Sequence, residues 1–445
     1  MSKNVKNMPS PRELAVHLLA RIELEGAYAD RILSTPRVMG LDPRDRAFAR
    51  ELVLGVLRWK LRLDHIIDSY YTMKAGKSLD PGVRTVLRLG LFQMMFMDSV
   101  PDRAAVYESV ELGSRLYGKH IGGLVNAVLR TFTRRGEPDN PQHDRALRLS
   151  VEKSCPVWLV RRWIDRFGEE TAEAVMDAAN RKHPVSIRVN SLKTDIPGLI
   201  NELKKSGFTA EPAGLPGYCT VEKGDGLFEK DAFRNGLFTV QDPAAALASE
   251  LMGPQPGERV LDLCAAPGGK TTHLAELMGD TGTVDAVDIN PNRLGLVEQA
   301  ARRIGLHSIR CMESDATVFR SMTGTPYDRV LIDAPCTGTA VFSKRPEMKW
   351  RRSEADILRM AELQGRIIGN AASLVRPGGV LVYSTCSLEP EENENVVERF
   401  MSMHAFEYMR DDRYRAYEHD CGYLILPHHM DGSGAFAVKL RRNEP

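Results

Sequence analysis

The sequence has no long run of apolar residues. Its apolar stretches fall well short of the roughly 18 residues that a membrane-spanning helix needs, and the first residues lack the apolar segment of a secretory signal. Seven cysteines are scattered along 445 residues, without the spacings of a disulfide framework or a zinc site. We therefore expect a soluble protein of the reducing cytoplasm, with no membrane contact and no metal.

The chain also lacks a strong net charge. Its formal charge is +1, which by itself indicates no class of partner. Residues 1–150, however, hold 24 Lys and Arg against 17 Asp and Glu, and the rest of the chain offsets this positive excess. A basic N-terminal module favours contact with nucleic acid, although a solvated helical surface explains the same excess.

Residues 10–135 predict a helical bundle. Apolar residues recur at helical spacing, and Asp80-Pro81 is a helix start signal, an N-cap followed by proline. Short connections between such helices are typical of a bundle, and the polar, proline-containing segment 136–145 predicts a linker. We assign residues 1–138 to an all-α domain, with helices over 11–20, 45–63, 83–97, 101–117 and 121–132.

Two further regions follow. Residues 139–240 contain two helical patterns and an alternating segment at 185–190, which predict a small α+β connector domain. Residues 241–445 alternate apolar strands with helices, which predicts a Rossmann-like α/β domain with a parallel, doubly wound sheet. Ligands of such sheets lie beyond the carboxyl ends of the strands. The expected strands cover 259–263, 283–287, 329–332 and 379–383.

The first of these strands ends in a glycine turn, Cys264-Ala-Ala-Pro-Gly-Gly-Lys270. Glycine lets the backbone approach a ligand at a helix N-terminus, which favours anionic groups. A nucleoside-triphosphate loop would need glycine at position 264, and a dinucleotide fingerprint needs separated glycines, so both fit poorly. S-adenosylmethionine has one carboxylate and no phosphate, so a single glycine turn suffices. A purely structural turn is the alternative.

Acidic residues follow the later strands. Asp288 stands 20 residues after Gly268, the usual interval for an acid that holds ribose hydroxyls. Asp315 stands where the next strand should finish, within reach of an adenine. Asp333 ends the strand 329–332 and favours a nucleoside triphosphatase, but the glycine turn argues against that class.

Cysteines end two strands. Cys336 closes Asp333-Ala-Pro-Cys and Cys386 closes Tyr383-Ser-Thr-Cys, so both thiols should meet at the ligand-binding edge. One methyl transfer that needs a thiol is transfer to C5 of cytosine, because this carbon is a poor nucleophile until a thiolate adds to C6. The reaction then needs a carboxyl group near N3 and a base that removes the C5 proton. Cys386, Asp333 and Cys336 supply these three groups.

These motifs also carry a resemblance. Residues 264–271, Asp333-Ala-Pro-Cys-Thr-Gly338 and Tyr383-Ser-Thr-Cys-Ser387 with Glu391-Glu-Asn-Glu394 resemble the NOL/NOP/Sun family of RNA cytosine-C5 methyltransferases. The N-terminal region, with 100–106 and 126–130, resembles a NusB-like RNA-binding domain. This pairing is typical of bacterial 16S rRNA (cytosine-C5) methyltransferases, and the similarity covers roughly residues 10–440.

The resemblance implies roles for individual residues. Cys386 corresponds to the nucleophile and Cys336 to the thiol that assists release. The implied cofactor-binding residues are Cys264, Ala265, Ala266, Pro267, Gly268, Gly269, Lys270, Asp288, Arg293, Asp315 and Asp333. Thr337 and Ala340 stand where the family usually has Ser and Gly, which leaves the chemistry intact but bears on the shape of that loop.

The implied partner is RNA, with 16S rRNA expected either free or in an early small-subunit particle, bound by a monomer. The basic segment 344–352 and the pair Arg188 and Asn190 are further candidates for RNA contacts, against the alternatives of a solvated loop and a structural role. Two other functions stay open: methylation of tRNA by the same machinery, and a non-catalytic RNA-binding regulator.

Overall fold

The computed structural model describes residues 9–71, 78–140, 143–222, 224–430 and 432–444, which fall into two compact units. The first unit spans 1–180 and 345–351, and the second spans 181–344 and 352–445. The three-domain division expected from the sequence, with boundaries after 138 and 240, stays a prediction that limited proteolysis would test. Among the described residues, none of the helices has the length and apolar character needed to cross a membrane.

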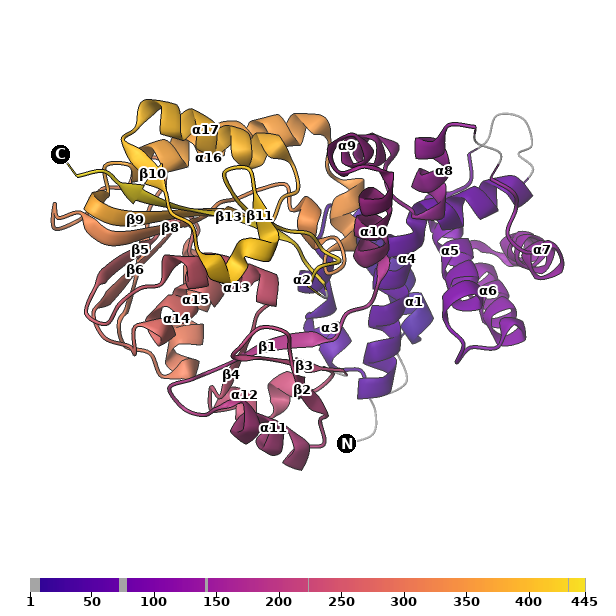
Figure 1. Cartoon of the computed structure of the whole chain (residues 1–445). Coiled ribbons are helices and arrows are strands. Elements are labelled where there is room, and N and C mark those ends of the chain that lie inside the picture. The colour runs from indigo at the N-terminus through magenta and orange to yellow at the C-terminus, as the bar shows by residue number, and fades with distance from the viewer. Residues whose placement is uncertain (1–8, 72–77, 141–142, 223, 431, 445) are drawn as a thin grey trace. The chain divides into compact units, whose positions relative to one another are not determined.

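The first unit is helical, as the sequence predicts (Figure 1). Asp42 and Asp80 cap two of its helices by accepting hydrogen bonds from backbone amides, and a proline follows each cap. The helices are α1 (Pro11–Leu24), α2 (Ala29–Leu33), α3 (Pro36–Met39), α4 (Pro43–Tyr70), α5 (Pro81–Phe96), α6 (Asp102–Tyr117), α7 (Lys119–Arg135), α8 (Arg145–Glu152), α9 (Val157–Phe167) and α10 (Glu169–Asn180). The buried leucines, isoleucines and valines of α1 to α7 form one core.

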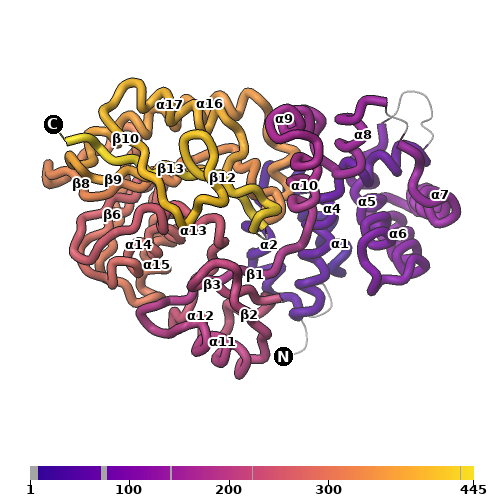
Figure 2. Tube along the Cα trace, in the orientation of Figure 1, coloured from indigo at the N-terminus to yellow at the C-terminus, as the bar shows by residue number. Residues whose placement is uncertain are grey.

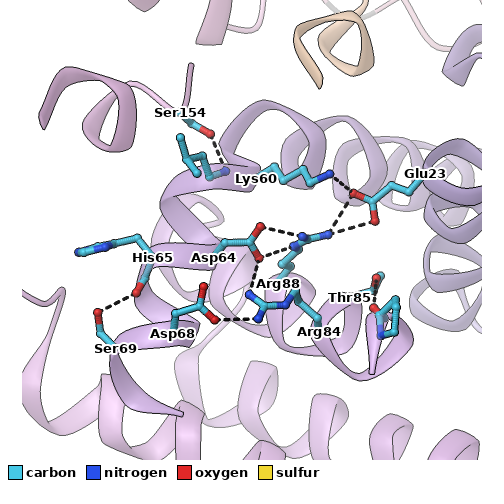
Figure 3. Close-up of polar contacts among 12 residues, drawn as sticks. Glu23, Lys60, Asp64, His65, Asp68, Ser69, Arg84, Thr85, Arg88 and Ser154 are labelled. Atoms are coloured by element: carbon cyan, nitrogen blue, oxygen red, sulfur yellow. Dashed lines mark hydrogen bonds and ion pairs between the residues drawn. The ribbon is translucent and has the colours of Figure 1, made fainter. Parts of the chain in front are cut away.

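A charged network crosses three of these helices (Figure 3). Arg88 of α5 has a side chain that is only 7% exposed, and it donates to both carboxylate oxygens of Asp64 on α4 at 2.8 and 2.7 Å. The same guanidinium contacts Glu23 of α1 at 3.0 Å, and Arg84 bridges Asp64 and Asp68. Each buried charge in this network therefore has an opposite partner.

Removal of Arg88 should destabilise the first unit strongly. In Arg88→Met the carboxylates of Glu23 and Asp64 each lose one of two cationic partners and keep Lys60 and Arg84, and the free energy of unfolding should fall by about 3 kcal/mol, the low end for breaking a buried pair. Urea denaturation of the full-length chain, followed by helical circular dichroism, measures this. Arg115→Met is the matched control: Arg115 pairs with Glu13 but is 57% exposed, so its loss should cost less than about 1 kcal/mol. Equal losses in the two variants would contradict a stabilising role for the buried network.

Residues 345–351 belong to this helical unit although they follow the segment that carries Cys336. Lys349, in the short helix η4 (Pro346–Trp350), is fully buried and donates to the carbonyls of Arg58 and Ser154 and to the side-chain oxygen of Asn180. Burial lowers the pKa of Lys349 to about 7. Trp350 likewise donates to a backbone carbonyl. The RNA contact expected of this segment is therefore wrong for these two side chains, whose polar groups bind the protein itself.

The second unit contains two sheets. The smaller has the strand order β2-β3-β1-β4, and it includes the strand expected at 185–190. Helix α11 (Ile196–Lys205), the short η2 (Leu227–Glu229) and α12 (Asp231–Arg234) accompany it. The strands are β1 (Val185–Val189), β2 (Ala210–Pro212), β3 (Tyr218–Val221) and β4 (Phe238–Val240), and every pair is antiparallel.

The larger sheet has nine strands among the described residues, in the order β11-β12-β13-β9-β8-β5-β6-β7, with β10 beside β13. Its strands are β5 (Arg259–Asp262), β6 (Thr283–Asp288), β7 (Ile309–Glu313), β8 (Tyr327–Asp333), β9 (Val375–Thr385), β10 (Phe406–Tyr408), β11 (Glu418–His419), β12 (Gly422–Ile425) and β13 (Ala435–Arg442). The strand pairs β7–β6, β6–β5, β5–β8 and β8–β9 are parallel. The C-terminal β13, yellow in Figure 2, runs antiparallel to β9, so the sheet is mixed at this end, beyond the four strands for which the sequence predicts parallel pairing.

Helices cover both faces of this sheet (Figure 1). Helices α13 (Pro243–Met252), α14 (Gly269–Leu277) and α15 (Pro291–Ile304) lie on one face, and α16 (Glu354–Ala371) and α17 (Glu394–Met403) lie on the other. Short helical turns η3 (Thr339–Val341), η5 (Pro390–Glu392) and η6 (Asp412–Tyr417) complete the unit. This is the doubly wound arrangement that the strand–helix alternation predicts.

Candidate active site

The glycine turn lies between β5 and α14. Gly268 has a φ of +104°, and a Cβ atom at this position would stand 3.0 Å from the Cα of Val297, so only glycine fits. Residues 264–270, expected to bind the cofactor, form this turn and the first residues of α14. Thr271 donates to Asp262 at the end of β5 at 2.8 Å, and burial raises the pKa of Asp262 to about 7. Asp262 is not among the site residues expected from the sequence.

Asp288 ends β6 beside this turn. Its buried carboxylate accepts from the backbone amides of Ala266 at 3.3 Å and Asn290 at 3.0 Å. Arg293, in the first turn of α15, lies 3.7 Å from Asp288 and also donates to the carbonyl of Ala266. The structure therefore brings Ala266, Asp288 and Arg293 together, as a shared cofactor site requires.

Asp315 lies after β7 and is exposed. Its carboxylate accepts from the backbone amide and the hydroxyl of Thr317, each at 2.8 Å, and these hydrogen bonds lower the pKa of Asp315. This acid thus stays ionised. Its contact with an adenine remains a prediction.

The two cysteines follow neighbouring parallel strands. In the register of β8 and β9, Asp333 stands opposite Ser384, and the chain continues from these residues to Cys336 and Cys386. The two sulfurs lie 3.1 Å apart. Both residues are partly buried, and the carbonyl of Cys386 accepts from the amide of Ala340 in the loop after Cys336. The structure thus places both thiols at one edge of the sheet.

The pair has an asymmetric electrostatic environment. The hydrogen bond between the two sulfurs, in which either thiol could be the donor, lowers the pKa of Cys386 and raises that of Cys336 well above its usual value. The positive charge of Lys270 also lowers the pKa of Cys386. Cys386 is therefore the sulfur that ionises first, and Cys336 keeps its proton while its neighbour is a thiolate.

A lysine–carboxylate pair lies beside the thiols. Lys270 donates to one oxygen of Asp333 at 2.7 Å, and the hydroxyl of Ser384 donates to the other at 3.1 Å. From the sequence, Lys270 is expected only to bind the cofactor. In the structure its side chain also reaches from the glycine turn to Asp333.

Arg188 and Asn190 do not face solvent. Both are buried, and Arg188 donates to the carbonyl of Gly269 at 3.0 Å and forms an ion pair with Glu276 of α14 at 2.9 Å. Asn190 donates to the carbonyls of Gly236 and Ile304. The expectation that they touch an RNA backbone is therefore wrong, because their polar atoms bind the protein interior.

An α/β sheet with a short glycine turn after its first strand, and acids after the next strands, defines a doubly wound protein with a ligand site at the carboxyl ends of its strands. A family model described as 16S rRNA methyltransferase RsmB/F matches residues 249–441. Models of the NusB family and of an RsmF/B-like ferredoxin-like domain match 9–134 and 155–219. The chain belongs to the RsmB/F family of 16S rRNA methyltransferases, which confirms the resemblance drawn from its motifs.

Relatives match along nearly the whole chain. A probable ribosomal RNA small subunit methyltransferase B of Bacillus subtilis is 33% identical over 97% of this chain and 99% of its own length. Ribosomal RNA small subunit methyltransferase B of Serratia proteamaculans is also 33% identical, over 98% of this chain and 99% of its own. The similarity therefore includes the helical region as well as the catalytic region.

Solved structures share the fold. The crystal structure of PH0851 has a TM-score of 0.82 at 28% identity and covers 98% of this chain and 99% of its own. That of NSun6 from Pyrococcus horikoshii with SFG has a TM-score of 0.58 at 25% identity, over 65% of this chain and 99% of its own. The fold of this chain is thus shared with both solved structures.

Proposed function

We propose that the protein methylates C5 of a cytosine in 16S rRNA, with Cys386 as the covalent nucleophile. The observation that carries this proposal is the pair of sulfurs 3.1 Å apart beside the Lys270–Asp333 ion pair. Methyltransferases that act on a ring nitrogen or a ribose hydroxyl have no need of a thiol, because those atoms are nucleophilic without covalent activation. Two thiols at the ligand-binding edge therefore favour carbon as the target.

Cys386 starts the reaction. Its lowered pKa increases the thiolate fraction, and the thiolate is the form that adds to an electron-poor ring carbon. A bond forms between its sulfur and C6 of cytosine, the C5–C6 double bond opens, and electron density moves to C5. Asp333 and Lys270 would lie near N3. The proton that Lys270 donates to Asp333 would there offset the negative charge that develops on N3.

S-adenosylmethionine supplies the methyl group that C5 receives. The residues present fit this cofactor: the glycine turn at the start of α14 suits its carboxylate, and the carboxylate of Asp288 suits its ribose hydroxyls. Arg293 fixes that side of the site through Asp288 and Ala266.

Cys336 then becomes the base. In the resting site its proton is held by the neighbouring Cys386 thiolate, which raises the pKa of Cys336. Once the Cys386 sulfur is bonded to C6 it carries no charge, so this cause disappears and Cys336 ionises more readily. The thiolate of Cys336 takes the C5 proton, the C5–C6 double bond re-forms, and the bond from C6 to Cys386 breaks to release the thiolate.

The product tests this function. After incubation of the full chain with 16S rRNA and S-adenosylmethionine, nucleoside mass spectrometry should detect 5-methylcytidine, and bisulfite sequencing should find one protected cytosine. A methyl group on N4 or on a ribose oxygen would overturn the C5 assignment. Parallel reactions with naked 16S rRNA, early small-subunit particles and tRNA test the proposed substrate, and light scattering of the active fraction tests whether the enzyme is a monomer.

Cofactor affinity is expected to depend on Asp288. Asp288→Ala removes the acceptor for ribose hydroxyls, and hydrogen bonds to a charged group contribute about 1.5–3 kcal/mol, so the Kd for S-adenosylmethionine should rise by roughly tenfold to a hundredfold. Calorimetric titration measures this affinity. Asp288→Asn is the control for the fold, since its amide oxygen still accepts from Ala266. An unchanged Kd in the folded alanine variant would refute the assignment.

A further inference from the structure

One buried carboxylate contacts the loops of both cysteines. Glu392, at the end of η5, is fully buried and accepts from the backbone amide of Thr337 at 2.8 Å and from its hydroxyl. The same carboxylate accepts from the hydroxyl of Ser387. Thr337 directly follows Cys336, and Ser387 directly follows Cys386. Glu392 therefore links the residues next to the two sulfurs.

The surroundings of Glu392 hold it in place. Gln364 of α16 donates to the carboxylate at 3.0 Å, and the hydroxyl of Tyr383 donates to the Glu392 carbonyl at 2.6 Å. The neighbouring Asn393 donates to the carbonyl of Ser387 at 2.9 Å and accepts from the hydroxyl of Thr385. The turn that carries Cys386 is thus fixed on both sides of the cysteine.

From this arrangement we propose that Glu392 is a positioning residue that holds the sulfurs of Cys336 and Cys386 at reacting distance. The inference rests on the proposed function only in treating these thiols as the reacting groups. Glu392 lies in the Glu391–Glu394 motif, for which the reaction chemistry itself supplies no role. It acts through Thr337 and Ser387.

The chemistry of the donors explains why a carboxylate stands here. Four N–H or O–H groups point at two oxygens, and only an ionised carboxylate accepts at both without offering a donor of its own. Glu392→Ala removes both oxygens, so the buried backbone amide of Thr337 and the side-chain amide of Gln364 lose this acceptor. An unsatisfied buried donor is costly, so the two loops should move apart to relieve it.

Thiol capture measures the geometry without RNA. Diamide, an azo oxidant, takes one hydrogen from each of two adjacent thiols and leaves a disulfide. Peptide mapping of the full chain should find the Cys336–Cys386 disulfide formed rapidly in the wild type. In Glu392→Ala its rate should fall about tenfold or more, since small displacements have large effects on reactions between held groups. Rates are compared across the titration range of the thiols, which separates displacement from a change in pKa.

The control and the second set of variants keep the test decisive. Glu398→Ala, an exposed change on α17, should behave as the wild type. If Glu392→Ala does not fold, Thr337 decides: Thr337→Val removes the hydroxyl donor and should slow capture, while Thr337→Ser keeps that donor and should restore it. In steady-state assays of RNA methylation, the slowed variants should have a lower kcat, while the KM for RNA stays near the wild-type value.

The outcomes separate this inference from the function on which it rests. Unchanged disulfide formation in folded Glu392→Ala, or equal rates in Thr337→Val and Thr337→Ser, would overturn the positioning role even if 5-methylcytidine is made. Slower capture in these variants supports the role even if the methylated atom proves to be other than C5.

Discussion

Cys386→Ala is expected to abolish methyl transfer, by a factor on the order of 10⁴ or more. Without the sulfur that adds to C6, the C5 atom of cytosine is never activated. The variant should also form no protein–RNA adduct on denaturing gels. Affinities for S-adenosylmethionine and RNA should stay near the wild-type values, since no bond to either precedes the attack.

An adduct that persists in Cys386→Ala would show that another residue is the nucleophile. If methylation also persists at the wild-type rate, the covalent mechanism is wrong and the sulfurs serve the packing of the sheet edge. A Cys386→Ser variant refines the test, because its hydroxyl has a similar size but ionises far less readily than a thiol. It should be as inactive as the alanine variant.

Cys336→Ala is expected to fail in the opposite way. Addition to C6 and methylation of C5 should still occur, but the base that removes the C5 proton is missing. A covalent adduct stable to denaturing electrophoresis should therefore accumulate, and each enzyme molecule should complete about one methylation. Quantifying adduct against total enzyme measures this stoichiometry.

The double variant tests the link between the two effects. The adduct should disappear in Cys336→Ala combined with Cys386→Ala, because it depends on the Cys386 sulfur. If instead Cys386→Ala traps RNA and Cys336→Ala is inert, the two roles are exchanged. The positive charge of Lys270, which lowers the pKa of Cys386, argues against that exchange.

The meeting of the two cysteines could be predicted from the sequence. Cys336 and Cys386 each follow an apolar strand by a few residues, and the carboxyl ends of parallel strands share one edge. The same argument places Asp288 beside the glycine turn. Periodicity and strand ends are local properties of the sequence. They therefore predict the fold class and the edge of the sheet at which the site lies.

Contacts between distant residues were not accessible in this way. Arg188 pairs with Glu276, which is 88 positions away, and nothing in a strand-ending Arg-x-Asn pattern distinguishes this partner from an RNA phosphate. Lys349 and its three acceptors pose the same problem in a segment that reads as basic and exposed. The antiparallel direction of β13 was not predicted, because direction leaves no mark in a strand's own pattern of apolar residues.

The proposed reaction depends on a bond from the Cys386 sulfur to cytosine C6. Tandem mass spectrometry of the nuclease-digested adduct from Cys336→Ala locates this bond. We expect one modified peptide, with a methylated cytidine attached at Cys386. Attachment at any other residue, or full formation of 5-methylcytidine by this variant with no adduct at any time, would contradict it.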